Sequence, residues 1–256
     1  ETVRKANLFL ENMLQSAFDG IIVTNEKGNI IRSNRAFEKM IDCSKEELNG
    51  KHMSEIVPLD QPYIDIMANM MSLLREKGFV ENCEVFFLRK DGSHFPVEFN
   101  VTQVRDETGK ISGAFSSIRD ITERKKIEQQ IKESRDFLEN IFKTSADGIL
   151  IVGKHNIITT ANDAAEKILG YPKKELIGKA LTYFDVPGDI HDKRAFEFIS
   201  RLFDEGTIKC FERQYVHKDG HLVDVELSAA LRKDAEGNVI DAVAILRDIT
   251  DRKQVE

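Results

Sequence analysis

The sequence contains one pattern twice, with a constant offset of 128 residues between the copies. Asp-Gly-Ile at 19–21 returns at 147–149, and Arg-Asp-Ile-Thr at 119–122 returns at 247–250. Solenoid repeats run only to about 50 residues, whereas roughly 100–150 residues is a common domain size. The chain is therefore predicted to hold two copies of one globular domain. Such a duplication favours a sensor or relay protein over an enzyme.

Composition narrows the class of protein further. The hydrophobic fraction is 41% and the charged fraction is 32%, which is typical of a globular protein. A net charge of −7 argues against nucleic acid or an anionic membrane as the main partner. No apolar run approaches the roughly 20 residues of a membrane span, and no secretory signal is visible. The three cysteines (Cys43, Cys83 and Cys210) form no CxxC pair, which favours a reducing, cytoplasmic location.

Each copy is predicted to start with an amphipathic helix and a β-hairpin. In the first copy, apolar residues recur at three- and four-residue spacing up to Ala17. The hairpin strands at 21–24 and 30–33 flank a polar turn. Helices follow at 34–40, 44–48 and 61–77, and Ser44 with Glu47 forms a capping-box pattern for the second of them.

The last third of each copy is predicted to be entirely β-strand. The first copy has strands at 79–88, 94–105 and 111–118, and the middle one alternates strictly between apolar and polar residues. The order is thus two strands, several helices and three strands. We expect an α+β fold, in which each domain is a five-stranded antiparallel sheet with helices on one face.

Residues 123–142 lie between the two copies and are rich in charged residues. Their apolar positions Ile127, Ile131, Leu138 and Ile141 fit a heptad, which predicts an amphipathic linker helix that forms a coiled coil. A single helix packed on its own domain is the alternative. With the N-terminal helix, which has a similar pattern, this helix is expected to make the chain a homodimer.

Three local signatures resemble those of the PAS domain family of bacterial and archaeal sensors. They are Asp-Gly-Ile at the first strand, Asn-x-Ala after the second strand (at 34 and 162), and the terminal Arg-Asp-Ile-Thr run. The resemblance covers nearly the whole chain and implies a sensory module upstream of an output domain. The expected domains are an N-terminal helix (1–18), a first PAS domain (19–122), the linker helix (123–142), a second PAS domain (143–250) and the start of an exit helix (251–256).

The terminal motif is predicted to transmit the signal. Thr122 and Thr250 have the side-chain type of a helix N-cap, and Asp120 and Asp248 can pair with a neighbouring cation and fix the exit angle of the helix. The simpler alternative is that both residues only stabilise the start of a helix.

The resemblance also implies a pocket between the sheet and the long helix of each copy, although nothing in the sequence names a ligand. An apolar helical face in the second copy comprises Ala195, Phe198, Ile199 and Leu202. The ligand-binding candidates are Ile64, Met67, Met71, Phe115 and Ser117 in the first copy, and Phe198, Leu202, Glu212 and Arg213 in the second.

No cofactor, metal or catalytic residue is predicted. The photoreceptor cysteine run is not found, and the long helix of the first copy has no histidine for haem. The second copy has His191 near the start of its helix, in a polar setting. His155, His191, His217 and His221 are spread over separate turns and strands, so they predict no metal site. The pair His217 and His221 flanks a Lys-Asp-Gly turn and is expected to be exposed. The fragment itself is expected to be non-catalytic.

The leading hypothesis is a tandem PAS sensory module, cut from a sensor histidine kinase or similar protein, that binds a small ligand. The chain lacks an initial methionine and stops inside a helical pattern, so the output domain is expected to lie outside it. One rival is a ligand-free structural relay and dimerisation module. The other is a haem or flavin sensor, which a visible absorption spectrum would reveal.

Overall fold

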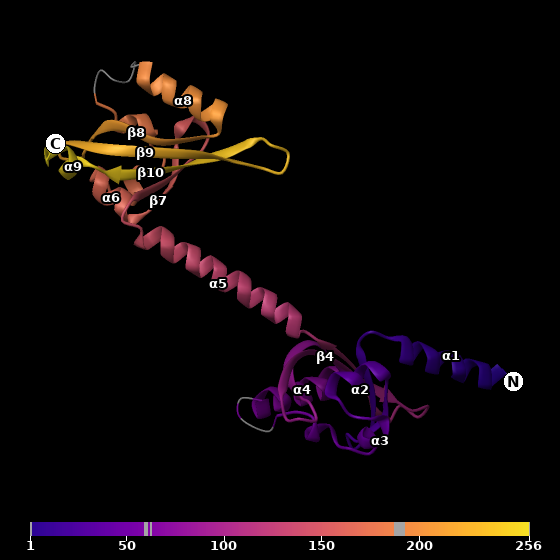
Figure 1. The fold of residues 1–256 in the computed structure, drawn as a ribbon. Coiled ribbons are helices and arrows are strands. Elements are labelled where there is room, and N and C mark those ends of the chain that lie inside the picture. The colour runs from indigo at the N-terminus through magenta and orange to yellow at the C-terminus, as the bar shows by residue number, and fades with distance from the viewer. Residues whose placement is uncertain (1, 59–60, 62, 187–192, 256) are drawn as a thin grey trace. The chain divides into compact units, whose positions relative to one another are not determined.

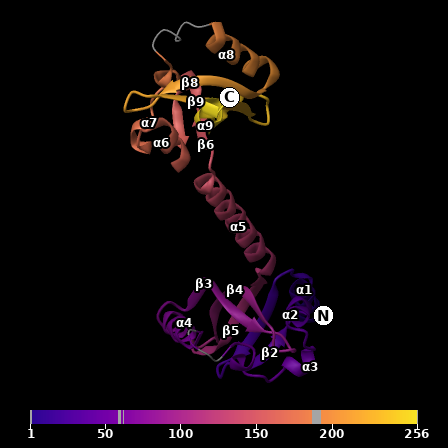
Figure 2. The same ribbon diagram turned by 60° about the vertical axis from the view of Figure 1, so that its left-hand side comes forward.

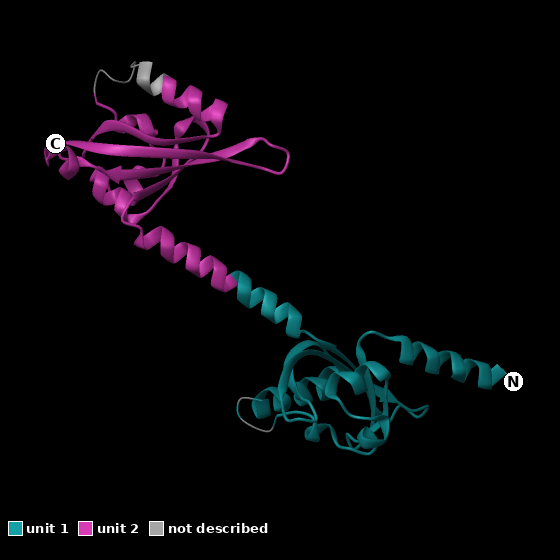
Figure 3. Cartoon of the chain, in the orientation of Figure 1, with its two compact units in different colours: residues 1–131 teal, residues 132–256 magenta. Residues whose placement is uncertain are grey.

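The computed structural model describes residues 2–58, 61, 63–186 and 193–255, and for 193–196 only the backbone. The chain divides into two compact units, residues 1–131 and 132–256 (Figure 3). Each unit has its own five-stranded antiparallel sheet, which confirms the predicted α+β fold. No helix within the described ranges has the length and apolar character required to span a membrane.

The elements of the first unit follow the predicted order (Figure 1). Its helices are α1 (Thr2–Ser16), α2 (Arg35–Ile41), α3 (Lys45–Leu48), the 3₁₀ turn η1 (Met53–Glu55) and α4 (Tyr63–Lys77). Its strands are β1 (Gly20–Asn25), β2 (Ile30–Ser33), β3 (Phe79–Leu88), β4 (His94–Arg105) and β5 (Ile111–Asp120). The capping box of α3 is confirmed, because the side chains of Ser44 and Glu47 each accept from the other residue's backbone N–H.

Helix α5 (Thr122–Thr144) leads from β5 towards the second copy, which repeats the pattern (Figure 2). The strands of the second copy are β6 (Gly148–Val152), β7 (Ile158–Ala161), β8 (Thr207–Val216), β9 (Leu222–Lys233) and β10 (Val239–Asp248). Its helices are η2 (Lys154–Asn156), α6 (Asp163–Leu169), α7 (Lys173–Leu176), η3 (Leu181–Phe184), α8 (Lys193–Glu205) and α9 (Thr250–Val255). Pro172 is the N-cap residue of α7.

The two sheets share one strand order, β2-β1-β5-β4-β3 and β7-β6-β10-β9-β8. The last strand of each copy therefore lies at the centre of its sheet, beside the first strand. Alternation fixes which face is buried: Phe95, Val97, Phe99 and Val101 of β4 are all at most 5% exposed. This inner face packs against the helices and forms the core of each domain.

One buried asparagine in each copy joins three elements. The Oδ1 atom of Asn34 accepts from the backbone N–H groups of Ile21 at 2.8 Å and Phe37 at 3.0 Å. Its Nδ2 donates to the carbonyls of Leu14 at 3.1 Å and Asp19 at 2.9 Å. The amide thus ties the end of the incoming helix to the start of β1 and the start of α2.

Asn162 makes the same four bonds in the second copy. Its Oδ1 accepts from Ile149 and Ala165, and its Nδ2 donates to the carbonyls of Phe142 and Asp147, all at 2.8–3.0 Å. Asn34 is 1% exposed and Asn162 is fully buried. No shorter or apolar side chain could make the same four hydrogen bonds, so a substitution would leave buried backbone groups without partners.

We predict that Asn162→Ala lowers the free energy of unfolding of the second domain by about 2–4 kcal/mol, because it leaves buried backbone donors and acceptors without partners. Urea unfolding followed by circular dichroism measures this. Asn140→Ala, at an exposed position of α5, is the matched control and should change stability by less than about 0.5 kcal/mol. Equal losses in the two variants would contradict the role assigned to the amide.

Candidate functional site

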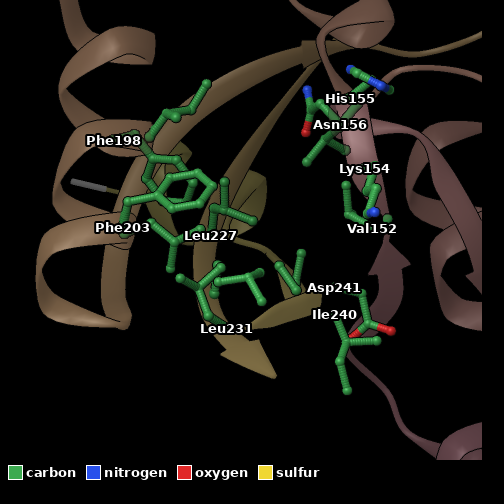
Figure 4. Close-up of a pocket in the computed structure, with 18 residues that line it drawn as sticks. Val152, Lys154, His155, Asn156, Phe198, Phe203, Leu227, Leu231, Ile240 and Asp241 are labelled. Carbon is green, nitrogen blue, oxygen red and sulfur yellow. The ribbon is translucent and has the colours of Figure 1, made fainter. Parts of the chain in front are cut away.

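The second copy has a pocket of about 540 Å³ between α8 and the inner face of its sheet (Figure 4). Phe198, Ile199, Leu202 and Phe203 of α8 form one wall. Apolar residues of β9 and β10 form the opposite wall, and Val152 of β6 and Leu181 of η3 complete it. The volume falls within the range of about 300–1,000 Å³ that is typical of small-molecule sites.

Polar residues gather at one side of this pocket. Lys154, His155 and Asn156 of η2 and Asp241 of β10 line it there (Figure 4). Asp241 Oδ1 accepts from Arg232 Nε at 2.9 Å, and this bond lowers the pKa of Asp241, so its carboxylate already has a cationic partner. The pocket therefore suits an apolar molecule with one polar end.

The candidates in the second copy divide between the two faces of the sheet. Phe198 and Leu202 line the pocket, as does Ile199. Glu212 is exposed and pairs with Arg252 at 3.0 Å and Lys253 at 2.9 Å of α9, so it does not face the domain interior. Ala195, expected on the apolar face of α8, is described only by its backbone, and His191 lies outside the described residues.

Arg213 points inward but contacts protein groups rather than the pocket. Its Nη2 donates to Asp185 Oδ1 at 2.6 Å, and its guanidinium lies 5.0 Å from the centre of the Tyr215 ring. Tyr215 is fully buried, and this burial raises the pKa of its hydroxyl.

In the first copy, the positions equivalent to Asp185, Arg213 and Tyr215 hold Val57, Val85 and Phe87, all at most 4% exposed. The second copy therefore holds a buried charged cluster at the place where the first copy holds a purely apolar one.

Most first-copy candidates lie away from the inner face. Ile64 and Met71 of α4 are 47% and 48% exposed, because the buried face of this helix centres on Met70. Met67 does pack against the core. Phe115 is 38% exposed, and Ser117 lies on the same outer face of β5. The alternate residues Ala114 and Ser116 face the core, so the expected phase of this strand was wrong by one residue.

At the junction with the exit helix, the aspartate of the terminal motif caps the helix, and the threonine does not. Asp120 Oδ1 accepts from the backbone N–H of Thr122, and Asp248 Oδ1 from that of Thr250, both at 2.8 Å. Asp120 also pairs with Arg89 at 3.2 Å. This arrangement corrects the assignment of the threonines as N-caps and gives the aspartates a direct bond to each helix.

The threonine hydroxyls differ between the copies because of one proline. Thr250 Oγ1 accepts from the backbone N–H of Asp224 at 3.1 Å. The equivalent residue in the first copy is Pro96, which has no N–H to donate. Thr122 Oγ1 is accordingly buried without a hydrogen-bond partner among the described residues.

The other charged residue of the terminal motif links it to the first motif of the same copy. Arg119 donates to both carboxylate oxygens of Asp19 at 3.0 and 2.8 Å. Arg247 and Asp147 repeat this bidentate pair at 3.1 and 2.8 Å. Sequence reasoning missed the pairs, although both partners belong to the repeated motifs. They place the end of the last strand beside the point where the chain enters the domain.

The β8–β9 hairpin contains a cluster that the sequence analysis rejected. The side-chain ligand atoms of His217, Asp219 and His221 all lie within 4.8 Å of one another. Hydrogen bonding from His217, and then from His221, lowers the pKa of Asp219 to about 2. Of these two histidines, both expected to be exposed, the His221 side chain is 57% exposed but that of His217 only 19%, and the tight turn between them brings both rings to Asp219.

Comparison with known families identifies the fold. A family model described as a PAS domain matches residues 19–123 and 146–251, which is most of the chain. The chain belongs to the PAS domain family. The family resemblance inferred from the three local signatures is thereby confirmed.

Several signalling proteins are similar to this chain. The chain is 27% identical over 248 residues to sporulation kinase E of Bacillus subtilis. The aligned region covers 96% of this chain and 31% of that protein. The chain is 24% identical over 156 residues to the signal transduction histidine-protein kinase AtoS of Escherichia coli, with coverage of 60% and 23%. The chain thus spans less than a third of these curated relatives.

Among solved structures, the PAS domain of a protein from Colwellia psychrerythraea is 24% identical, with a TM-score of 0.42, and covers 48% of this chain and 99% of that one. Tandem PAS domains, together with relatives that are histidine kinases, support a sensory signal-transduction module.

Proposed function

We propose that this chain is the sensory region of a histidine kinase or similar signalling protein, and that its second PAS domain binds a small, largely apolar molecule. The observation that carries the proposal is the pocket of about 540 Å³ beneath α8. Its walls are mostly aliphatic and aromatic, and Lys154 supplies a cationic group at its polar side. A ligand with an apolar body and an acidic end matches both features.

Strand β10 connects this pocket to the exit helix α9. Ala242 and Ala244 of β10 line the pocket, and Asp248 at the end of the same strand caps α9. Asp248 lies four positions after Ala244, which is about 13 Å along a strand. A ligand that displaces β10 therefore acts on the strand that sets the start of α9.

The aniline–naphthalene sulfonate dye ANS, an apolar ring system with one acidic group, is a suitable probe of the pocket. We predict that ANS binds the wild-type chain at one site and that Ala242→Phe, which fills the pocket, weakens its affinity at least tenfold. Val243→Phe places the same ring on the outer face of β10 and should leave the affinity within twofold. Fluorescence titration measures both. Similar affinities in the two variants would show that the dye binds elsewhere and that the pocket proposal fails.

The terminal motif provides a second test, in a chimera with a reporter kinase. Asp120→Ala and Asp248→Ala are each predicted to cost about 1–2 kcal/mol of stability, the size of a lost helix cap, and to fix the output at one level. Asp251→Ala removes an exposed carboxylate in the first turn of α9 without removing the cap, so it is the control. If both cap variants still respond over the wild-type range, the aspartates only stabilise the helices.

We also propose that the chain forms a homodimer through its helices. Ile127, Ile131, Leu138 and Ile141 are 48–64% exposed, and no described residue of α5 is buried. This exposed apolar stripe supports pairing with a second helix over packing on the chain's own domain. On α1, Val3, Leu10 and Met13 are also more than half exposed. A second copy of the chain would cover these apolar stripes in register.

We predict that replacing Ile131 and Leu138 together with Glu halves the mass measured by light scattering. Adding the same charges at Gln130 and Asn140 of the same helix should leave the mass unchanged. A wild-type chain that stays monomeric at high concentration would contradict self-association by this region.

A further inference from the structure

Three side chains of metal-binding type, two histidines and one aspartate, converge at the β8–β9 hairpin of the second copy. Asp219 Oδ1 lies 2.8 Å from His217 Nδ1 and 2.5 Å from His221 Nδ1. The two imidazole rings stack with their centres 4.3 Å apart and their planes at 26°. Two ring nitrogens therefore face one carboxylate oxygen, and all three atoms are within 4.8 Å of one another.

The protein holds two of these ligands in place. The side chain of His217 is 19% exposed and rests against Gly170 at the end of α6, where any Cβ would collide with its ring. Next to it, the backbone N–H of Lys218 donates to Leu169 at 3.2 Å, which docks the hairpin on α6. Asp219 Oδ1 accepts from the backbone N–H of His221 at 3.2 Å. The His221 side chain is 57% exposed and can rotate.

We infer that His217, Asp219 and His221 form a binding site for a divalent transition-metal ion, with Zn²⁺ the best match. Imidazole nitrogen and carboxylate oxygen bind Zn²⁺ at about 2.0–2.2 Å in tetrahedral geometry, which places the ligand atoms roughly 3.4 Å apart. The His221 Nδ1–Asp219 Oδ1 distance must therefore open by about 0.9 Å, which rotation of the exposed His221 ring supplies. The His217 Nδ1–Asp219 Oδ1 distance must open by about 0.6 Å, which a small rotation of the exposed Asp219 carboxylate supplies. Two imidazoles disfavour Mg²⁺ and Ca²⁺, which prefer oxygen ligands.

The equivalent turn of the first copy has the aspartate but neither histidine, so it shows which of the three side chains the turn itself needs. There, Asp91 Oδ1 accepts from the backbone N–H of Ser93 at 2.8 Å, in the same turn as Asp219 and His221. Arg89 stands at the position of His217 and pairs with Asp120. The aspartate is thus explained by the turn, whereas the two histidines are specific to the second copy. The site lies outside the pocket, so it stands independently of the proposed ligand.

Isothermal titration of the tag-free full chain with ZnCl₂ at neutral pH tests the site. We expect one Zn²⁺ per chain, and an affinity at least tenfold weaker in both His221→Ser and Asp219→Asn. His221→Ser installs the residue that the first copy has at this position, and Asn retains the acceptor of the turn, so both variants should fold. His94→Ser removes an exposed histidine from the first-copy hairpin and should bind like wild type.

Co²⁺ titration of the wild-type chain gives a reading that does not depend on any variant. Visible absorption bands of four-coordinate Co²⁺, displaced by one equivalent of Zn²⁺, would support the site. The inference is overturned if the wild-type chain gives no saturable binding, or if either ligand variant keeps an affinity within tenfold of wild type. Circular dichroism of the metal-free variants confirms that each compared protein is folded.

Discussion

Both domains depend on one buried side-chain amide, Asn34 in the first copy and Asn162 in the second. Its four hydrogen bonds hold together the end of the incoming helix, the first strand and the first short helix of the domain. These backbone groups lie where regular structure is interrupted, so they have no ladder or helix partners of their own. A single residue therefore determines where the chain enters the sheet, and the rest of the fold follows from that point.

The exit from each domain is built beside its entrance. Because the last strand pairs with the first, the bidentate pair of Arg119 with Asp19 spans only neighbouring strand ends, although 100 residues separate the partners. The next residue, Asp120, caps the outgoing helix. Such exposed pairs contribute little stability individually, so their value lies in geometry. Entrance and exit are thus mechanically adjacent, which is the arrangement that a relay needs.

Local patterns predicted the fold well, because strand alternation and capping signals act over a few residues. The strands at 79–88 and 94–105 were predicted with the bounds that the structure has. Strand β5 was harder, since small residues such as Ala114 and Ser116 give no clear apolar phase, and the large Phe115 was wrongly placed inside. Pairing of charges between segments far apart in the sequence, as between Arg213 of β8 and Asp185 at the end of η3, depends on the fold itself and could not be predicted from local patterns.

The buried cluster of Asp185, Arg213 and Tyr215 has a consequence for how the interior of one copy can be exchanged for that of the other. The equivalent trio of the first copy is entirely apolar, so the two interiors differ at three positions that depend on one another. Removing only one member of a buried ion pair leaves an uncompensated charge and typically costs about 3–5 kcal/mol. A single substitution such as Asp185→Val would therefore be strongly destabilising, although the equivalent trio of the first copy is wholly apolar. Exchanging one interior for the other requires several substitutions at once, so the two cores cannot be interconverted one residue at a time.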